Sequence, residues 1–135
     1  MSAIELSVSD WLGLLSHVKK WLANLLRAGP KRKADSKQAL RNVVRAVRRT
    51  EVYVRHLREN GQKAIDTEEE LSSLWTELSF SLEDLGLGVL AKRCRIKGQY
   101  WADPSRFDQE FLDKAGVKLS EIEKIARLTL NQLND

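Results

Sequence analysis

The sequence predicts an all-α protein, a compact bundle of four or five mostly antiparallel helices. Three observations lead to this fold class. Apolar residues recur every three or four positions, capping residues and Gly or Pro separate the segments, and no segment alternates with a period of two for long enough to form a strand. The 135 residues fit one domain, 1–135. The composition, with 42 per cent hydrophobic and 31 per cent charged residues, is typical of a folded protein. Short connections, about five to eight residues, favour antiparallel neighbours.

The first helix is predicted from Ser9 to Ala28. Ser9 can cap it, and the pair Gly29-Pro30 ends it. Its apolar positions, spaced alternately by four and three, are Trp11, Leu15, Val18, Leu22 and Leu25. Polar and charged residues interrupt it before the ~18 apolar residues that a membrane span requires, so we expect no membrane crossing.

The second helix is predicted to begin at Asp35 or Ser36 and to end at Asn60. Gly61 then supplies the usual left-handed stop. The apolar residues on one side of this helix are Leu40, Val43, Val44, Val47, Val54 and Leu57.

The third helix is predicted to begin at a capping box formed by Thr67 and Glu70. Its apolar phase continues across Gly86 and Gly88 as far as Gly98, which favours a kink or a short interruption over a full stop. A second apolar line, formed by Phe80, Leu87 and Cys94, predicts a central helix that is buried on two sides.

Two helices follow. Asp103-Pro104 is a cap and first turn for a fourth helix, roughly Pro104 to Lys114, which Gly116 closes. Its buried side is predicted to be Phe107 and Phe111. A capping box opens the fifth helix at Ser120 and Glu123, and its buried residues are predicted to be Ile122, Ile125, Ala126, Thr129 and Leu133.

Charge is distributed along the chain in blocks. Residues 31–59 contain ten Lys or Arg and three acids, whereas residues 61–90 contain seven acids and one Lys. One interpretation is that the two helices neutralise each other, with four acids facing the second helix: Glu68, Glu69, Glu83 and Asp84. The alternatives are that the basic face meets a partner or is simply solvated.

A nucleic-acid interface is one hypothesis for these cations. Five of them lie within about 80° of one another on the second helix, a pattern that suits contact with phosphates: Lys37, Arg41, Arg45, Arg48 and Arg55. A second basic cluster follows at Lys92, Arg93, Arg95 and Lys97.

A protein interface is the other hypothesis. Trp, Tyr and Arg dominate binding hot spots, and the chain has more large apolar side chains than one core of this size needs. The predicted docking residues are Phe80, Tyr100 and Trp101, although Tyr100 and Trp101 could instead fold onto the core.

Arg49 and His56 lie seven positions apart on the second helix. This spacing resembles the Arg and His pattern of HEPN-type helical ribonucleases, a resemblance that covers two residues. It implies cleavage of an RNA phosphodiester at a dimer interface.

The sequence contains no phosphate loop, dinucleotide fingerprint or nucleophile motif, so we predict no catalytic residues and no cofactor. The chain has two His and one Cys. His17 and His56 are too far apart to share an ion, and Cys94 is placed with apolar residues, so we predict no metal site. A single Cys also excludes an internal disulfide, and no export signal is recognised, so we expect a cytoplasmic protein.

The sequence therefore favours a non-enzymatic helical interaction module: an adaptor, a regulator or a small subunit that holds a protein partner or a second copy of itself. The alternative is a nucleic-acid-binding protein that uses the two basic clusters, and a more remote one is a HEPN-like ribonuclease.

Overall fold

The computed structural model describes residue 13 and residues 16–134, and about 87 per cent of the described residues are helical. After a helix over residues 16–26, the elements are α2 (Pro30–Asn60), α3 (Ile65–Asp84), α4 (Gly88–Ala102), the short 3-10 helix η1 (Pro104–Arg106), α5 (Gln109–Ala115) and α6 (Leu119–Asn134). No strand occurs in this described part, and the predicted all-α bundle is confirmed. The predicted cap at Ser9 lies outside the described residues.

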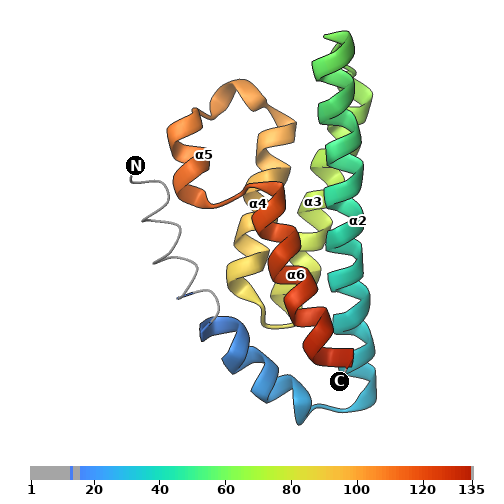
Figure 1. The fold of residues 1–135 in the computed structure, drawn as a ribbon, viewed down its shortest axis with the longest axis vertical. Helices are drawn as coiled ribbons and strands as arrows, with labels where there is room; N and C mark the ends of the chain where they lie inside the picture. Colours follow the sequence, from blue (N-terminus) through green and yellow to red (C-terminus); the bar gives the residue numbers. More distant parts are fainter. Residues whose placement is uncertain (1–12, 14–15, 135) are drawn as a thin grey trace.

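The helices pack around one core (Figure 1). α2 is the longest helix and forms one edge of the bundle, with α3 beside it and α4 running back along α3. α6 crosses α2 in the opposite direction, and the helix over residues 16–26 lies near the start of α2. α5 contributes no fully buried side chain and lies at the periphery.

α2 begins earlier than predicted. Its first residue is Pro30, and Gly29 precedes it in an extended conformation. Proline is favoured at the first helical position because its missing N–H would be unpaired there anyway and its φ suits a helix. The predicted start at Asp35 or Ser36 was therefore wrong, whereas the predicted stop is confirmed by Gly61, which has a φ of 67°.

The predicted capping box of Thr67 and Glu70 does not cap α3. The helix begins two residues before Thr67, which lies inside the first turn. Glu68 is buried, and its carboxylate accepts a hydrogen bond of 2.5 Å from the Tyr53 hydroxyl. That hydroxyl in turn accepts a hydrogen bond of 3.0 Å from the backbone N–H of Ala64, so a side chain of α2 satisfies a donor at the start of α3.

α3 and α4 form an antiparallel hairpin, so the prediction of a kink or a short interruption instead of a full stop was wrong. The chain reverses at residues 85–87, where Gly86 has a φ of 86°. The Leu85 carbonyl accepts hydrogen bonds from the Trp21 indole at 2.7 Å and from the Arg32 guanidinium at 2.9 Å. These bonds tie the turn to the preceding helices. The apolar phase runs through the glycines because both arms of the hairpin bury side chains in the same core.

Gly98 was predicted to end a helix, but it is buried within α4, which continues to Ala102. A Cβ atom at this position would overlap Thr76 Oγ1 and would lie 3.1 Å from the Ser72 carbonyl oxygen. The Ser72 hydroxyl also donates a hydrogen bond of 2.8 Å to the Gly98 carbonyl. Glycine at this position therefore allows α3 and α4 to approach closely.

Trp75 lies at the centre of the core and is fully buried. Its indole N–H donates to Thr50 Oγ1 at 2.9 Å, and the Thr50 hydroxyl donates to the Ala46 carbonyl at 2.8 Å. The ring therefore buries a large apolar area without leaving its polar atom unpaired.

Two short helices replace the predicted fourth helix. Asp103 caps η1, and Asp108 caps α5 by accepting a hydrogen bond of 2.7 Å from the Phe111 backbone N–H. The Phe111 side chain is 47 per cent exposed, so its predicted burial was wrong. Gly116, with a φ of 65°, ends α5 as predicted.

α6 packs on α2 through the predicted residues Ile122, Ile125, Ala126 and Thr129. The predicted capping box of Ser120 and Glu123 is absent, because Glu123 instead accepts hydrogen bonds of 2.7 Å from Arg48 of α2 and from Arg127. These bonds lower the pKa of Glu123 to about 2.

Candidate interaction surface and ligand cavity

The opposite charges of α2 and α3 are largely not neutralised within the molecule. One ion pair joins the two helices in the part of the chain that the structure describes, between Arg49 and Glu70 at 3.0 Å. No described ion pair joins α2 to the acids that were predicted to face it, namely Glu68, Glu69, Glu83 and Asp84. Mutual neutralisation therefore explains little of the charge pattern.

The five cations predicted to form a basic face on α2 differ in their surroundings. Arg48 and Arg55 form ion pairs with acids of α6 and of α2 itself. Lys37 is half-buried. Arg41 and Arg45 are exposed and form no ion pair with any described residue. These two arginines are the cations best placed to meet an external charge.

The second predicted basic cluster divides between two sides of α4. Lys92 and Arg95 are exposed. Arg93 is half-buried and donates hydrogen bonds to two backbone carbonyls at the turn between α5 and α6. Lys97 enters a cavity described below. The four cations do not form a common surface.

The three predicted docking residues also separate. Phe80 is 59 per cent exposed on α3, and Tyr100 is half-buried. Trp101 is only 5 per cent exposed, because its ring packs edge-on against Tyr53 with 5.5 Å between ring centroids. Trp101 is therefore not available as a surface contact in this structure.

A groove of about 650 Å³ lies between α2 and α3. Its lining residues are Arg48, Arg49, Val52, Tyr53, His56, Ala64, Thr67 and Glu70. Val52 is 66 per cent exposed, although its neighbours on the outer side of α2 are mostly charged. An exposed valine among arginines is an apolar contact point on an otherwise polar face.

Two exposed ridges of opposite charge run along this α2–α3 face. The basic ridge is Arg41, Arg45 and Arg49 on α2, and the acidic ridge is Asp66, Glu70, Glu77 and Asp84 on α3. Their spacings keep each set on one side of its helix. Arg49 pairs with Glu70, and the helices run in opposite directions, so Glu77 lies level with residue 42, between Arg41 and Arg45.

Arg49 and His56, the residues that resemble the HEPN pattern, both line the groove. Arg49 is paired with Glu70. His56 Nδ1 lies 3.0 Å from the side-chain amide of Asn60, and its ring stacks on Tyr53. Arg49 and His56 therefore lie on one surface, but each already interacts with another side chain.

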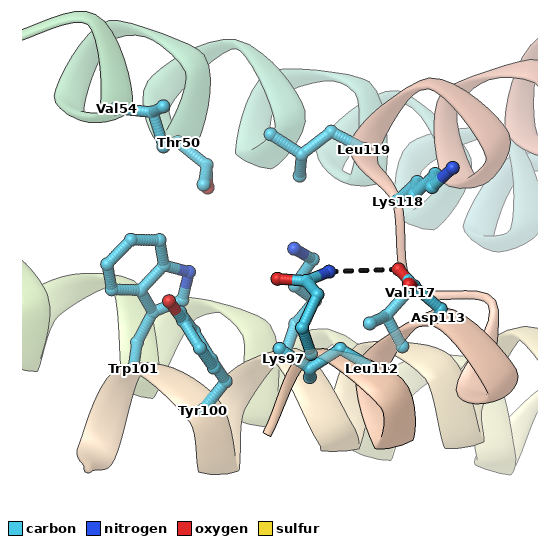
Figure 2. A pocket seen from close by; sticks show the side chains of 11 residues that line it. Thr50, Val54, Lys97, Tyr100, Trp101, Leu112, Asp113, Val117, Lys118 and Leu119 are labelled. Atoms are coloured by element: carbon cyan, nitrogen blue, oxygen red, sulfur yellow. Dashed lines mark hydrogen bonds between the residues drawn. The ribbon is translucent and has the colours of Figure 1, made fainter. Parts of the chain in front are cut away.

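A second, smaller cavity of about 190 Å³ lies between α2, α4, α5 and the start of α6 (Figure 2). Its lining includes the apolar or aromatic residues Val54, Tyr100, Trp101, Leu112, Val117 and Leu119. Its polar residues are Thr50, Lys97, Gln109, Asp113 and Lys118.

Two hydrogen-bond donors in this cavity lack acceptors among the described residues. The Trp101 indole nitrogen is buried without a partner. The Lys97 amine forms no hydrogen bond or ion pair there and lies 5.9 Å from the centroid of the Tyr100 ring. Burial lowers the pKa of Lys97 to about 8. Figure 2 shows both nitrogen atoms directed toward the interior of the cavity.

The sequence did not reveal this cavity, because Lys97 was grouped with its charged neighbours in the chain. The available signal was its spacing: Lys97 precedes Tyr100 by three positions and Trp101 by four, which places all three on one side of a helix. A lysine that shares a side with two aromatic residues is partly withdrawn from water.

Cys94 is buried, and burial raises the pKa of its thiol to about 12, so it packs as a small apolar residue. Within the residues that the structure covers, no group of three or more His, Cys, Asp or Glu is arranged to hold a metal ion. None of the described helices combines the length and the apolar content required to cross a bilayer.

Comparison with known proteins gives no relative: no family model, no curated protein and no solved structure shows significant similarity to the chain.

Proposed function

We propose that the protein is a non-enzymatic interaction module that acts in the cytoplasm as a homodimer assembled through the α2–α3 face. The observation that carries this proposal is the pair of exposed ridges, basic on α2 and acidic on α3, with Val52 exposed on the same side of α2 as the basic ridge. A face with two parallel ridges of opposite sign is complementary to a second copy of itself.

The ridges define which symmetry the dimer has. A two-fold axis parallel to α2 and α3, lying in the interface, places the basic ridge of each copy over the acidic ridge of the other. An axis across the helices would stack like charges. With the first axis, Glu77 of one copy reaches the level of Arg41 and Arg45 of its partner, and the exposed Val52 side chains approach the two grooves.

The size of the face is compatible with a stable dimer. α3 has 20 residues and is therefore roughly 30 Å long, and two adjacent helices are roughly 20 Å wide. The resulting area approaches the ~800 Å² per partner of a standard interface. The groove supplies an apolar contact near the end of α2 and the start of α3, and the charged ridges supply polar contacts along the rest of the face.

Replacing Val52 with glutamate tests this proposal. We expect the parent protein to sediment as a dimer and the Val52→Glu variant to sediment as a monomer, because the change places a charge at the apolar contact between Val52 and the groove of the second copy. Val52 is exposed in the single chain, so the free energy of unfolding of the monomer should change by less than about 0.5 kcal/mol.

The matched control is Leu26→Glu, since Leu26 is 58 per cent exposed on a different helix. This variant should remain dimeric. A parent protein that is monomeric at all accessible concentrations would contradict the proposal, as would a Val52→Glu variant that dimerises like the parent.

Binding of nucleic acid is the second candidate, favoured by the two exposed arginines that lack an acidic partner, Arg41 and Arg45. Double replacement of both by glutamine should then abolish binding of RNA or duplex DNA, whereas Val52→Ser should leave it intact. If the dimer proposal is correct, replacement of Val52 should instead weaken the assembly.

Incubation of the same preparations with labelled RNA tests the ribonuclease alternative. That alternative requires that Arg49→Ala and His56→Ala each remove cleavage.

A further inference from the structure

We propose that the cavity between α2, α4, α5 and α6 is a binding site for a small organic acid of about the size of benzoate, whose carboxylate is held by Lys97 and Trp101. This site is separate from the α2–α3 face and does not depend on the dimer. Its lining comes from four helices that the fold brings together at one end of α4 (Figure 2).

The polar groups of the cavity define the charge of the ligand. Lys97 and Trp101 present an ammonium and an indole N–H, both of which are donors only. Buried donors in proteins are nearly always paired, yet the buried Trp101 indole nitrogen has no acceptor within the described chain, and the amine of the half-buried Lys97 forms no hydrogen bond or ion pair there. The two oxygen atoms of a carboxylate can accept from both groups at once, and a hydrogen bond to a charged group is a strong one.

The remaining charges in the lining do not oppose an anion. Lys118 lines the cavity from the turn before α6, but it is exposed and its amine points away from the interior (Figure 2). Asp113 of α5 is the acid of this lining, and its carboxylate already accepts a hydrogen bond of 2.9 Å from the Gln109 side chain. α2 contributes Thr50 and Val54, neither of which carries a charge. Lys97 is therefore the cation directed into the cavity, and the acid of the lining is already engaged by Gln109.

The walls and the volume define the body of the ligand. Val54, Leu112, Val117 and Leu119 are aliphatic, and the two aromatic rings of α4 complete the enclosure. The volume of about 190 Å³ exceeds the ~150 Å³ of a cavity that accommodates benzene. An aromatic or branched aliphatic acid fills this space, whereas inorganic phosphate would leave the apolar walls without a contact.

Isothermal titration of the full chain with benzoate tests the proposal directly. We expect benzoate to bind with a dissociation constant of about 1 mM or lower, and the neutral analogue benzamide to bind about tenfold more weakly or not at all. Inorganic phosphate should not compete. If benzamide binds as well as benzoate, or if benzoate does not bind, the assignment is overturned.

Two variants locate the site. Lys97→Met keeps the length of the side chain and removes its charge, so it should weaken benzoate binding by about tenfold or more, while Lys92→Met, at an exposed lysine of the same helix, should not. Trp101→Phe keeps an aromatic ring and removes the donor, with a smaller loss expected. Circular dichroism verifies that each variant is folded. Binding by Lys97→Met that matches the parent would place benzoate elsewhere and contradict the proposal.

The pH dependence gives an independent readout. The pKa of Lys97 is about 8 because the amine is buried, so raising the pH well above 8 removes the charge that holds the carboxylate, and benzoate should bind more weakly. Tyr100, Asp113 and Lys118 also line the cavity and are the other groups there that can titrate. If Lys97 is the group responsible, the loss of binding at high pH should be absent from Lys97→Met. A loss of equal size in both proteins would contradict its role.

The carboxylate could also belong to the end of a peptide chain. A short peptide ending in phenylalanine, tested with a free and with an amidated C-terminus, separates the two sources. We expect benzoate to bind at least as tightly as either form, because a volume of about 190 Å³ accommodates one ring with its carboxylate and offers no further enclosed contact to a preceding residue. Tighter binding of the free-ended peptide would overturn the assignment to a free acid.

Discussion

Replacing Trp75 with alanine is expected to lower the free energy of unfolding by about 3–5 kcal/mol, the largest single effect in the protein. Trp75 is fully buried, and its removal leaves a cavity at the centre of the core. It also leaves Thr50 Oγ1 without the indole donor that reaches it at 2.9 Å. Because a domain of this size is stable by about 5–15 kcal/mol, this loss is a large fraction of the total stability.

Urea denaturation followed by circular dichroism measures this loss. Trp75→Phe is the matched control, since it keeps most of the apolar volume and removes the hydrogen bond, and it should lose clearly less stability than the alanine variant. A loss below about 1 kcal/mol for Trp75→Ala would contradict the position of Trp75 in the core.

Replacing Lys97 with methionine is expected to stabilise the protein at neutral pH by about 1–3 kcal/mol. The amine has a pKa of about 8 in the folded chain and about 10.5 without burial, so folding disfavours the protonated amine. Methionine fills a similar volume without that cost. The same substitution should weaken benzoate binding by about tenfold or more, so one change raises stability while it lowers ligand affinity.

The sign of the pH dependence follows from these two pKa values. Between about pH 8 and about pH 10.5 the folded protein has released the Lys97 proton while the unfolded chain still binds it, so the stability of the parent relative to Lys97→Met rises with pH over this range. Urea denaturation of both proteins at neutral pH and at the upper end of this range measures the difference. A Lys97→Met variant that is less stable than the parent at neutral pH would show that the lysine contributes to packing and is not an unpaired buried cation.

Helix periodicity predicted the fold class well, because each of the longer helices buries one apolar side in a single core. The residues that stop or start helices were harder to interpret. Gly98, Gly86 and Pro30 are all residues that interrupt helices in many sequences. In this fold Gly98 permits a close crossing of α3 and α4, Gly86 reverses the chain, and Pro30 starts α2. Only tertiary contacts distinguish these roles, and a single sequence does not contain them.

The candidate sites show the same difference between what helix periodicity predicts and what tertiary contacts decide. Exposure of Arg41 and Arg45 could be predicted from their side of the helix, whereas Phe80, which was placed on a second apolar line with Leu87 and Cys94, is 59 per cent exposed, so its predicted burial was wrong. Grouping the cations of α4 by their neighbourhood in the chain was misleading, since Arg93 supports the turn before α6 and Lys97 enters a cavity that α2, α5 and α6 complete. Trp101 is buried because Tyr53, far away in the sequence, packs against it. Contacts between distant segments decided each of these cases.

Sedimentation of two charge-swapped variants, alone and mixed, tests the proposed dimer most directly. In the proposed dimer, Arg41→Glu with Arg45→Glu places acids opposite Glu77 of the second copy, whereas Glu70→Lys with Glu77→Lys places lysines opposite the arginines of the second copy's basic ridge. Each variant alone should be monomeric because like charges oppose each other across the interface, and an equimolar mixture should form a heterodimer. If both variants dimerise alone, or if the mixture remains monomeric while the parent is dimeric, the α2–α3 face is not the interface.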